Sequence, residues 1–310
     1  MYRPLSFCWR GGLYENRQTP KHQNIRSRCW VFLRAASCFF LIFFVVISIG
    51  YCLYMSFFDW KLIDLGASKL FVGLKNYLYM FKDKVFRAVL GNTLLIVLCC
   101  LVIETVLGFG IALTLWVYRK PTKWIQTVFL LPMITSPVIV GLIWRYIYDP
   151  QFGILNYALG KVAGIGHVPW LGDERFALFS VILVDIWQMT PFTILILYAA
   201  MLGINDDWLE AAQVDGASFG TVVRKIIIPS ILPMSSFILL MRSMDLMKIF
   251  DTIYVLTRGG PGYATETLAM YTYRVGFSEY NMGYAMALSI VTLILVLAVS
   301  SFYIRKSTHR

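Results

Sequence analysis

Six stretches of nearly continuous apolar residues alternate with short polar segments along this chain. At about 1.5 Å per helical residue, each stretch is long enough to cross about 30 Å of hydrocarbon. The pattern therefore predicts an all-α, polytopic membrane protein with six transmembrane helices. The predicted helices cover residues 31–58, 88–118, 124–148, 176–202, 226–256 and 282–304.

Two of these stretches contain prolines that predict irregular helices. Pro132 and Pro137 lie in the third stretch, and Pro191 lies in the fourth. Proline removes a backbone hydrogen bond and clashes with the preceding turn, so we expect kinks at these points. Neighbouring helices can cover the backbone groups that a kink frees.

Composition supports a membrane protein. The chain is 58% hydrophobic and 15% charged, whereas soluble domains carry about 25% charged residues. Its mean hydropathy is +0.67. These values exclude a disordered chain, a collagen-like chain and most soluble enzymes.

The charge distribution predicts the topology. The net charge is +11, and bases gather in a tail over residues 1–30 and in the turn 119–123. Lys and Arg beside apolar segments favour the cytoplasmic side and meet anionic lipid headgroups. We therefore expect cytoplasmic tails at 1–30 and 305–310 around a transmembrane domain at 31–304. The expected partner of the basic charge is the lipid bilayer, not nucleic acid.

No catalytic or metal site is predicted in this chain. The histidines are scattered, and no cysteine forms a CxxC pair or lies beside histidines at metal-ligand spacing. We interpret the cysteines as reduced thiols that pack as small apolar residues. They are Cys8, Cys29, Cys38, Cys52, Cys99 and Cys100.

The segment 203–233 is too polar to span a membrane, and it predicts two short helices. Asn205 starts the first helix with carboxylates in its first turn, and Asp215 and Gly216 end it. A helix–Gly–helix elbow of this kind is typical of a docking element, but an ordinary connecting loop fits the same pattern.

The motif within this segment resembles a known family. Glu210, Ala211 and Ala212 are followed by Gly216 after three spacers and by a run that ends in Pro229. This spacing resembles the EAA loop of ABC-importer permeases, although Ile228 stands where that family usually has Leu. Further motifs resemble the sugar-importer branch of the family. They lie at residues 71–77, 92–94, 131–132, 153–156, 170–171, 250–251, 254–257, 259–261 and 283–285, with Trp144.

The resemblance implies a permease of the bacterial cytoplasmic (inner) membrane that pairs with a second, homologous permease. It implies two ATPase subunits at the cytoplasmic face and an extracytoplasmic solute-binding protein outside. The EAA loop would be the coupling helix, with Glu210 meeting a basic group on the ATPase. Ala211 and Ala212 would allow close approach, and Asp215 and Gly216 would form the elbow.

The chain lacks a Walker A motif, GxxxxGK[ST]. We therefore expect a non-catalytic subunit without a cofactor of its own. ATP and Mg would be bound by the partner ATPase.

Ionisable residues within the apolar stretches are costly and are functional candidates. Glu104 lies deep in the second stretch, where an interhelical hydrogen bond is the simplest interpretation. Arg242 and Asp245 share one face of the fifth stretch. Two interpretations stay open for Arg242: an ion pair with Asp245, or a contact with an anionic group on the solute. The remaining ionisable residues are Arg145, Asp185, Lys248 and Asp251.

The resemblance also places solute contacts in the middle of the fourth and fifth helices. Aromatic rings can stack on a pyranose while amides bind its hydroxyls. Phe192 fits ordinary core packing equally well. The substrate-pathway candidates are Trp187, Gln188, Phe192, Arg242, Asp245 and Leu246.

Together these observations predict a carbohydrate permease that works by alternating access. The candidate solutes are an oligosaccharide, including an acidic one such as a uronate oligosaccharide, and a sugar or glycerol phosphate. The alternative is a secondary transporter or channel without an ATPase partner, which does not explain the EAA loop. A membrane-bound enzyme fits less well because no catalytic cluster is present.

Overall fold

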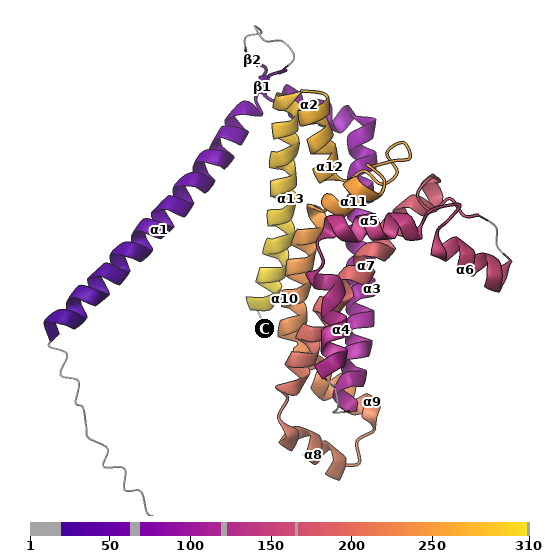
Figure 1. The fold of residues 1–310 in the computed structure, drawn as a ribbon. Coiled ribbons are helices and arrows are strands. Elements are labelled where there is room, and N and C mark those ends of the chain that lie inside the picture. The colour runs from indigo at the N-terminus through magenta and orange to yellow at the C-terminus, as the bar shows by residue number, and fades with distance from the viewer. Residues whose placement is uncertain (1–19, 63–68, 119–122, 165–166, 309–310) are drawn as a thin grey trace, which may run out of the picture. The chain divides into compact units, whose positions relative to one another are not determined.

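The computed structural model describes residues 20–62, 69–118, 123–164 and 167–308 (Figure 1). Two parts of the chain, Met1–Tyr51 and Cys52–Arg310, form separate compact units. Residues 1–19 of the predicted basic tail lie outside the described residues.

Helix α1 (Pro20–Met55) makes up the described part of the first unit and runs into the second. It begins within the predicted 1–30 tail, eleven residues before the apolar stretch. Its window Cys38–Met55 is apolar enough to cross a membrane. Ring pairs one turn apart, such as Phe40 and Phe44 with centroids 4.6 Å apart, line this helix.

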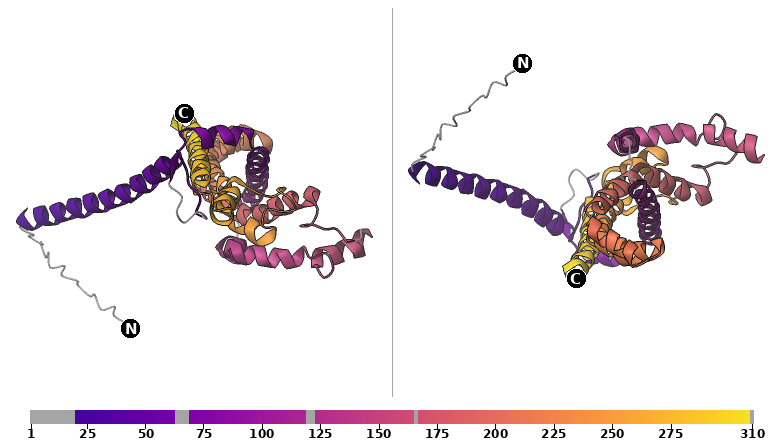
Figure 2. Two further views of the ribbon diagram at one scale, coloured as in Figure 1. Left: turned by 90° about the horizontal axis from the view of Figure 1, so that it is seen from above. Right: turned by 90° about the horizontal axis from the view of Figure 1, so that it is seen from below.

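Four long helical segments run side by side in the second unit (Figures 1 and 2). Helix α3 (Lys84–Val117) and helix α7 (Glu174–Leu202) pack along each other and against α10 (Ile228–Met247), which also contacts α13 (Met282–Thr308). The side chains of Asp83 and Asp173 cap the first two helices by accepting hydrogen bonds from Val85 N and Arg175 N.

The third predicted span is broken rather than kinked. Helix α4 (Lys123–Ile134) meets helix α5 (Pro137–Ile147) at an angle of 98°. The break falls just before Pro137, because a residue that precedes proline is disfavoured in helical geometry. Pro132 stays inside α4. The predicted single helix over 124–148 is therefore wrong in form. With the bent pair counted as one span, the described residues provide up to six spans.

The fifth predicted span also ends earlier than expected. Helix α10 stops at Met247, and residues 251–256 form a separate helix α11 (Asp251–Leu256) that packs against α5. Hydropathy cannot place this end, because the intervening Ile249 and Phe250 are apolar. At the other end, α9 (Phe219–Val222) and the π-helical turn η1 (Val223–Ile227) lead directly into α10.

The predicted outer segments contain ordered structure. Strand β1 (Phe58–Asp59) pairs antiparallel with β2 (Leu70–Phe71), and α2 (Lys75–Lys82) follows. Helix α6 (Ile154–Ala163) projects to one side of the bundle (Figure 1). Helix α12 (Leu268–Tyr273) and the π-helical turn η2 (Arg274–Ser278) precede α13. The two strands are short, so the predicted all-α class is confirmed.

Close contact between α3 and α7 depends on a glycine. A Cβ atom added at Gly108 would lie 2.5 Å from Thr193 Cγ2 and 2.9 Å from Thr193 Cβ. Helices in a membrane associate through such small residues, because lipid and side chains are equally apolar.

Replacing Gly108 with Leu should therefore force α3 and α7 apart, with an overpacking cost of about 1–3 kcal/mol. Gly110→Leu is the matched control, because nothing lies within 4 Å of an added Cβ there. The measurement is the recovery and unfolding midpoint of detergent-purified protein. Equal losses for both variants would contradict this close packing.

Candidate functional site

The polar loop folds as predicted into a short helix that ends in a glycine elbow. Helix α8 (Asp206–Val214) starts at Asn205, whose side chain accepts a hydrogen bond of 3.0 Å from Asp207 N. Acidic side chains in the first turn complement the positive end of the helix dipole. Helix α8 lies at one end of the bundle (Figure 1). Its residue Leu209 is buried.

Gly216 turns the chain at the end of α8. Its φ of +69° is in the left-handed region, which glycine adopts without strain. Gly216 N donates to Gln213 O, and Ala217 N donates to Ala212 O, which is the hydrogen-bond pattern of a Schellman motif. An added Cβ would meet nothing within 4 Å. Glycine is therefore required here for its backbone conformation, not for space.

The five predicted coupling residues lie together on this elbow. Glu210, Ala211, Asp215 and Gly216 are exposed, and Ala212 is half-buried. Between α8 and the start of α10 is a hollow of about 640 Å³, and Ala211, Ala212 and Asp215 line it. The site thus presents a short helix with small side chains and one accessible carboxylate, Glu210.

A buried ion cluster joins three of the long helices. Arg242 of α10 binds Glu104 of α3 through two hydrogen bonds, Nε to Oε2 at 2.9 Å and Nη2 to Oε1 at 2.8 Å. Its Nη2 also donates to Asp185 Oδ2 of α7 at 2.6 Å. These three residues are 3%, 1% and 6% exposed, respectively. We call Glu104, Asp185 and Arg242 the buried triad.

The Arg242–Asp245 ion pair, one of the two open interpretations of Arg242, is absent from the described residues. Asp245 instead pairs with Lys248 at 3.4 Å, and both of these side chains are exposed. The long side chain of Arg242 reaches into the interior and binds the carboxylates of Glu104 and Asp185. The side chain of Asp245, on the same helix, is exposed. The expected interhelical hydrogen bond of Glu104 is present, with Arg242 as its donor.

Cys100 adjoins the triad. Its sulfur and carboxylate oxygens of Glu104 and Asp185 all lie within 4.8 Å of one another, a spacing compatible with a metal ion. Both carboxylates already bind the guanidinium of Arg242. The arrangement is therefore fully explained as an ion cluster in which Arg242 is the cation.

A cavity of about 360 Å³ opens beside the triad, between α7 and the end of α10. Four of the six predicted substrate-pathway residues line it: Gln188, Arg242, Asp245 and Leu246. Gln188 Nε2 also donates to Thr135 O at 3.1 Å, a carbonyl at the break between α4 and α5. The cavity therefore lies where irregular backbone is covered by protein. The remaining lining residues are Pro137, Asp185, Met189, Lys248, Ile249, Phe250, Asp251 and Thr252.

The two predicted aromatic contacts do not line this cavity. Trp187 is exposed and meets Trp144 edge-on, with ring centroids 5.5 Å apart. Phe192 packs on an apolar cluster that includes Ile194 and Leu197. One turn beyond Gln188, α7 has passed the cavity and entered this cluster. Phe192 is therefore half-buried against apolar side chains in this chain.

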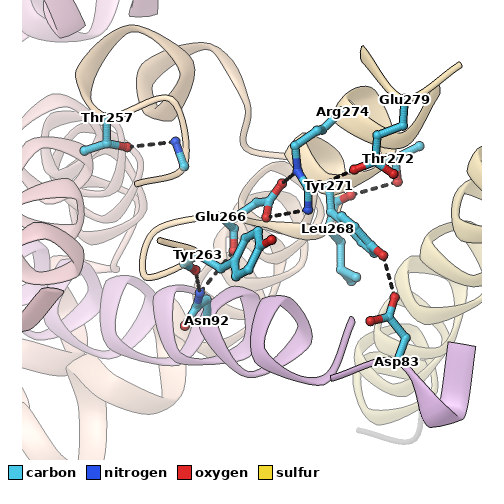
Figure 3. A network of polar contacts seen from close by, with 11 residues as sticks. Asp83, Asn92, Thr257, Tyr263, Glu266, Leu268, Tyr271, Thr272, Arg274 and Glu279 are labelled. Carbon is cyan, nitrogen blue, oxygen red and sulfur yellow. Dashed lines mark hydrogen bonds and ion pairs between the residues drawn. The ribbon is translucent and has the colours of Figure 1, made fainter. Parts of the chain in front are cut away.

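A polar network near the start of α3 is not predicted by the sequence (Figure 3). Asn92 Nδ2 donates to the carbonyls of Tyr263 at 2.8 Å and Glu266 at 3.2 Å. Glu266 in turn binds Arg274 at 2.7 Å. These contacts fix the segment before α12 to α3. In the sequence, residues 92–94 match only a family motif, and nothing local reveals the distant partners of Asn92.

Asp83 anchors the same region. Tyr271 and Tyr284 donate to its Oδ2 at 2.5 and 2.9 Å. Partial burial acts to raise the pKa of Asp83, but these bonds and those from Val85 N and Phe86 N hold it below the usual value. The carboxylate therefore stays ionised and keeps its hydrogen bonds at neutral pH.

Up to six candidate membrane spans among the described residues, with charged groups buried between the long helices, are typical of a polytopic membrane protein. The chain belongs to the family described as "Binding-protein-dependent transport system inner membrane component", whose model matches residues 104–309. The predicted family, the ABC-importer permeases, is thereby confirmed.

Individual relatives match over most of the chain. A probable ABC transporter permease of Sinorhizobium fredii is 35% identical over 89% of this chain and 88% of its own length. The trehalose/maltose transport system permease MalF of Thermococcus litoralis is 34% identical, covering 78% and 81%. A bacterial alginate ABC transporter, solved in complex with an alginate pentasaccharide-bound periplasmic protein, has a similar fold. Its TM-score is 0.76 at 23% identity, covering 91% of this chain and 94% of that chain.

The triad makes a direct prediction about stability. Arg242→Ala would leave two buried carboxylates without their cation, which typically costs about 3–5 kcal/mol. Asp245→Ala removes an exposed carboxylate from a surface pair and should cost less than about 1 kcal/mol. Unfolding midpoints of the two purified variants give the comparison. Equal destabilisation would mean that Asp245, not the triad, holds Arg242.

Proposed function

We propose that this chain and a second, homologous permease together form the translocation pathway of an ATP-driven carbohydrate importer. The pathway opens alternately to each side of the membrane. Family membership supports the permease role. The trehalose/maltose permease among the relatives and the alginate transporter with a similar fold support a carbohydrate as the solute.

The observation that carries this proposal is the exposed elbow formed by α8 and Gly216. Helix α8 ends in a Schellman motif, and its residue Leu209 is buried in the bundle. Both features fix α8 to the end of the bundle. A movement of an ATPase bound to it would pass through η1 directly into α10. Helix α10 contributes Arg242, Asp245 and Leu246 to the cavity wall. The elbow is thus mechanically continuous with the proposed pathway.

The ATPase chemistry belongs to partner subunits in this proposal. Two ATPase subunits bind ATP and Mg at the cytoplasmic face, and Glu210 meets a basic group on one of them. The chain itself is non-catalytic and needs no cofactor. An extracytoplasmic solute-binding protein delivers the carbohydrate, as the complex with a periplasmic protein suggests by analogy.

The orientation that follows places both termini and α8 in the cytoplasm of a bacterial cell, and α6 outside its inner membrane. The two comparisons leave the charge of the solute open, because trehalose and maltose are uncharged whereas alginate is an acidic polysaccharide.

The coupling role predicts a specific effect at Gly216. Gly216→Val places a β-branched residue at φ +69°, where L-residues are strained by about 1–2 kcal/mol or more. The elbow should distort, and solute uptake should fall by about fivefold or more for each 1 kcal/mol that docking loses. Gly220→Val is the control, because Gly220 lies in α9 with no positive φ and open space around it.

Affinity purification of the tagged chain supplies the readout. Mass spectrometry of the eluate should find a Walker A-containing ATPase with the native chain and with Gly220→Val, and less of it with Gly216→Val. Normal recovery of the ATPase and normal uptake with Gly216→Val would reject the coupling role. Elution without any ATPase from the native chain would favour a secondary transporter.

The orientation has its own test. Ser218→Cys and Lys161→Cys introduce thiols at exposed positions in the α8–α9 elbow and in α6. A membrane-impermeant thiol reagent added to spheroplasts should label Lys161→Cys, and Ser218→Cys only after permeabilisation. Labelling is scored against the native chain, which has cysteines of its own. The opposite pattern would place the elbow outside the cell, away from any ATPase.

A further inference from the structure

More acidic than basic residues line the cavity between α7 and the end of α10. Asp185, Asp245 and Asp251 contribute carboxylates, whereas Arg242 and Lys248 contribute the basic groups. The wall therefore carries more negative than positive formal charge. These residues all belong to the part of this chain that the structure describes.

The positive charge of Arg242 is neutralised by the triad itself. Glu104, which does not line the cavity, accepts two hydrogen bonds from Arg242. Asp185 accepts a third hydrogen bond from Arg242 at 2.6 Å. Two carboxylates thus face one guanidinium. Because both bonds to Glu104 are direct and buried, an incoming anion would have to displace a carboxylate before it could bind this arginine.

The other basic group is also engaged. Lys248 Nζ lies 3.4 Å from Asp245 Oδ1. Asp251, in the first turn of α11, has no ion-pair partner among the described residues. The cavity therefore offers carboxylate oxygens, which accept hydrogen bonds, beside apolar side chains such as Leu246 and Phe250.

Charges that line a protein cavity interact more strongly than charges in bulk water. A wall with surplus carboxylates and a neutralised arginine repels anions. Sugar hydroxyls suit the same wall, because they can donate hydrogen bonds to carboxylates while the ring face packs on apolar groups.

From this geometry we infer that the cavity excludes anionic solutes, so that the importer takes a carbohydrate without net negative charge. The inference rests on the proposed function and narrows its solute class. It removes uronate oligosaccharides and sugar phosphates, for which Arg242 was the candidate anion-binding group.

Charged thiol reagents can measure the potential in the cavity without knowledge of the solute. Met189→Cys and Ile249→Cys each place a thiol on the cavity lining, one on α7 and one after α10. Three methanethiosulfonates of similar size would be used, with trimethylammonium, hydroxyl or sulfonate end groups. Their reaction rates are measured on the purified complex and divided by their rates with a free thiol. The native chain supplies the background.

The cationic reagent should react at least about fivefold faster than the sulfonate at both positions, after this correction, as expected for a potential near one kT per charge. Adding Asp251→Asn should lower this ratio by about twofold or more. The control, Asp59→Asn, alters an exposed carboxylate of β1 outside the cavity lining and should leave the ratio unchanged.

A sulfonate rate equal to or above the cationic rate would overturn the inference, as would a ratio insensitive to Asp251→Asn. Failure of every reagent to react at both positions would show that the cavity is closed to solutes, which also overturns it. These readouts do not depend on ATPase recovery. A failed coupling test and a failed charge test are therefore distinguishable.

Discussion

A guanidinium buried among apolar helices needs a counter-charge, and this requirement organises the centre of the protein. Arg242 meets it with Glu104 and Asp185, which come from two other helices. The cluster fixes the positions of α3, α7 and α10 relative to one another, because a shift of any one would leave a buried charge unpaired. Contacts such as that at Gly108 then bring the helices close enough for these bonds to form.

Side chains also bind irregular backbone at two places in the bundle. The break between α4 and α5 exposes a carbonyl at Thr135, and Gln188 binds it. The segment before α12 is bound in the same way by Asn92. Side chains thus supply the hydrogen bonds that water would otherwise provide. The cavity lies beside the first of these sites, and its wall is polar for the same reason.

Local signals in the sequence predicted local structure well. The six apolar stretches located the spans, and the spacing from Asn205 to Gly216 predicted helix α8 and its elbow. Both depend on residues within a few turns of one another. The resemblance to the EAA loop added the family, which the elbow geometry alone does not define.

Features that depend on distant residues could not be predicted in this way. Glu104 and Arg242 are 138 positions apart, so Asp245, three residues away, appeared to be the natural partner. Beyond the 98° break, α5 packs against α11, a contact that the prolines alone do not reveal. The family resemblance implies that Trp187 and Phe192 contact the solute. The surroundings of each side chain depend on the helices that pack around it, and the sequence does not show these.

The central claim is that the triad neutralises Arg242 and holds three helices as one body during transport. Cryo-electron microscopy of the assembled complex, without nucleotide and trapped with ATP, tests it most directly. The account predicts that Arg242 Nη2 stays within about 3.2 Å of both Glu104 and Asp185 in the two states. An Arg242 side chain turned toward Asp245, or toward a bound solute, in either state would contradict it.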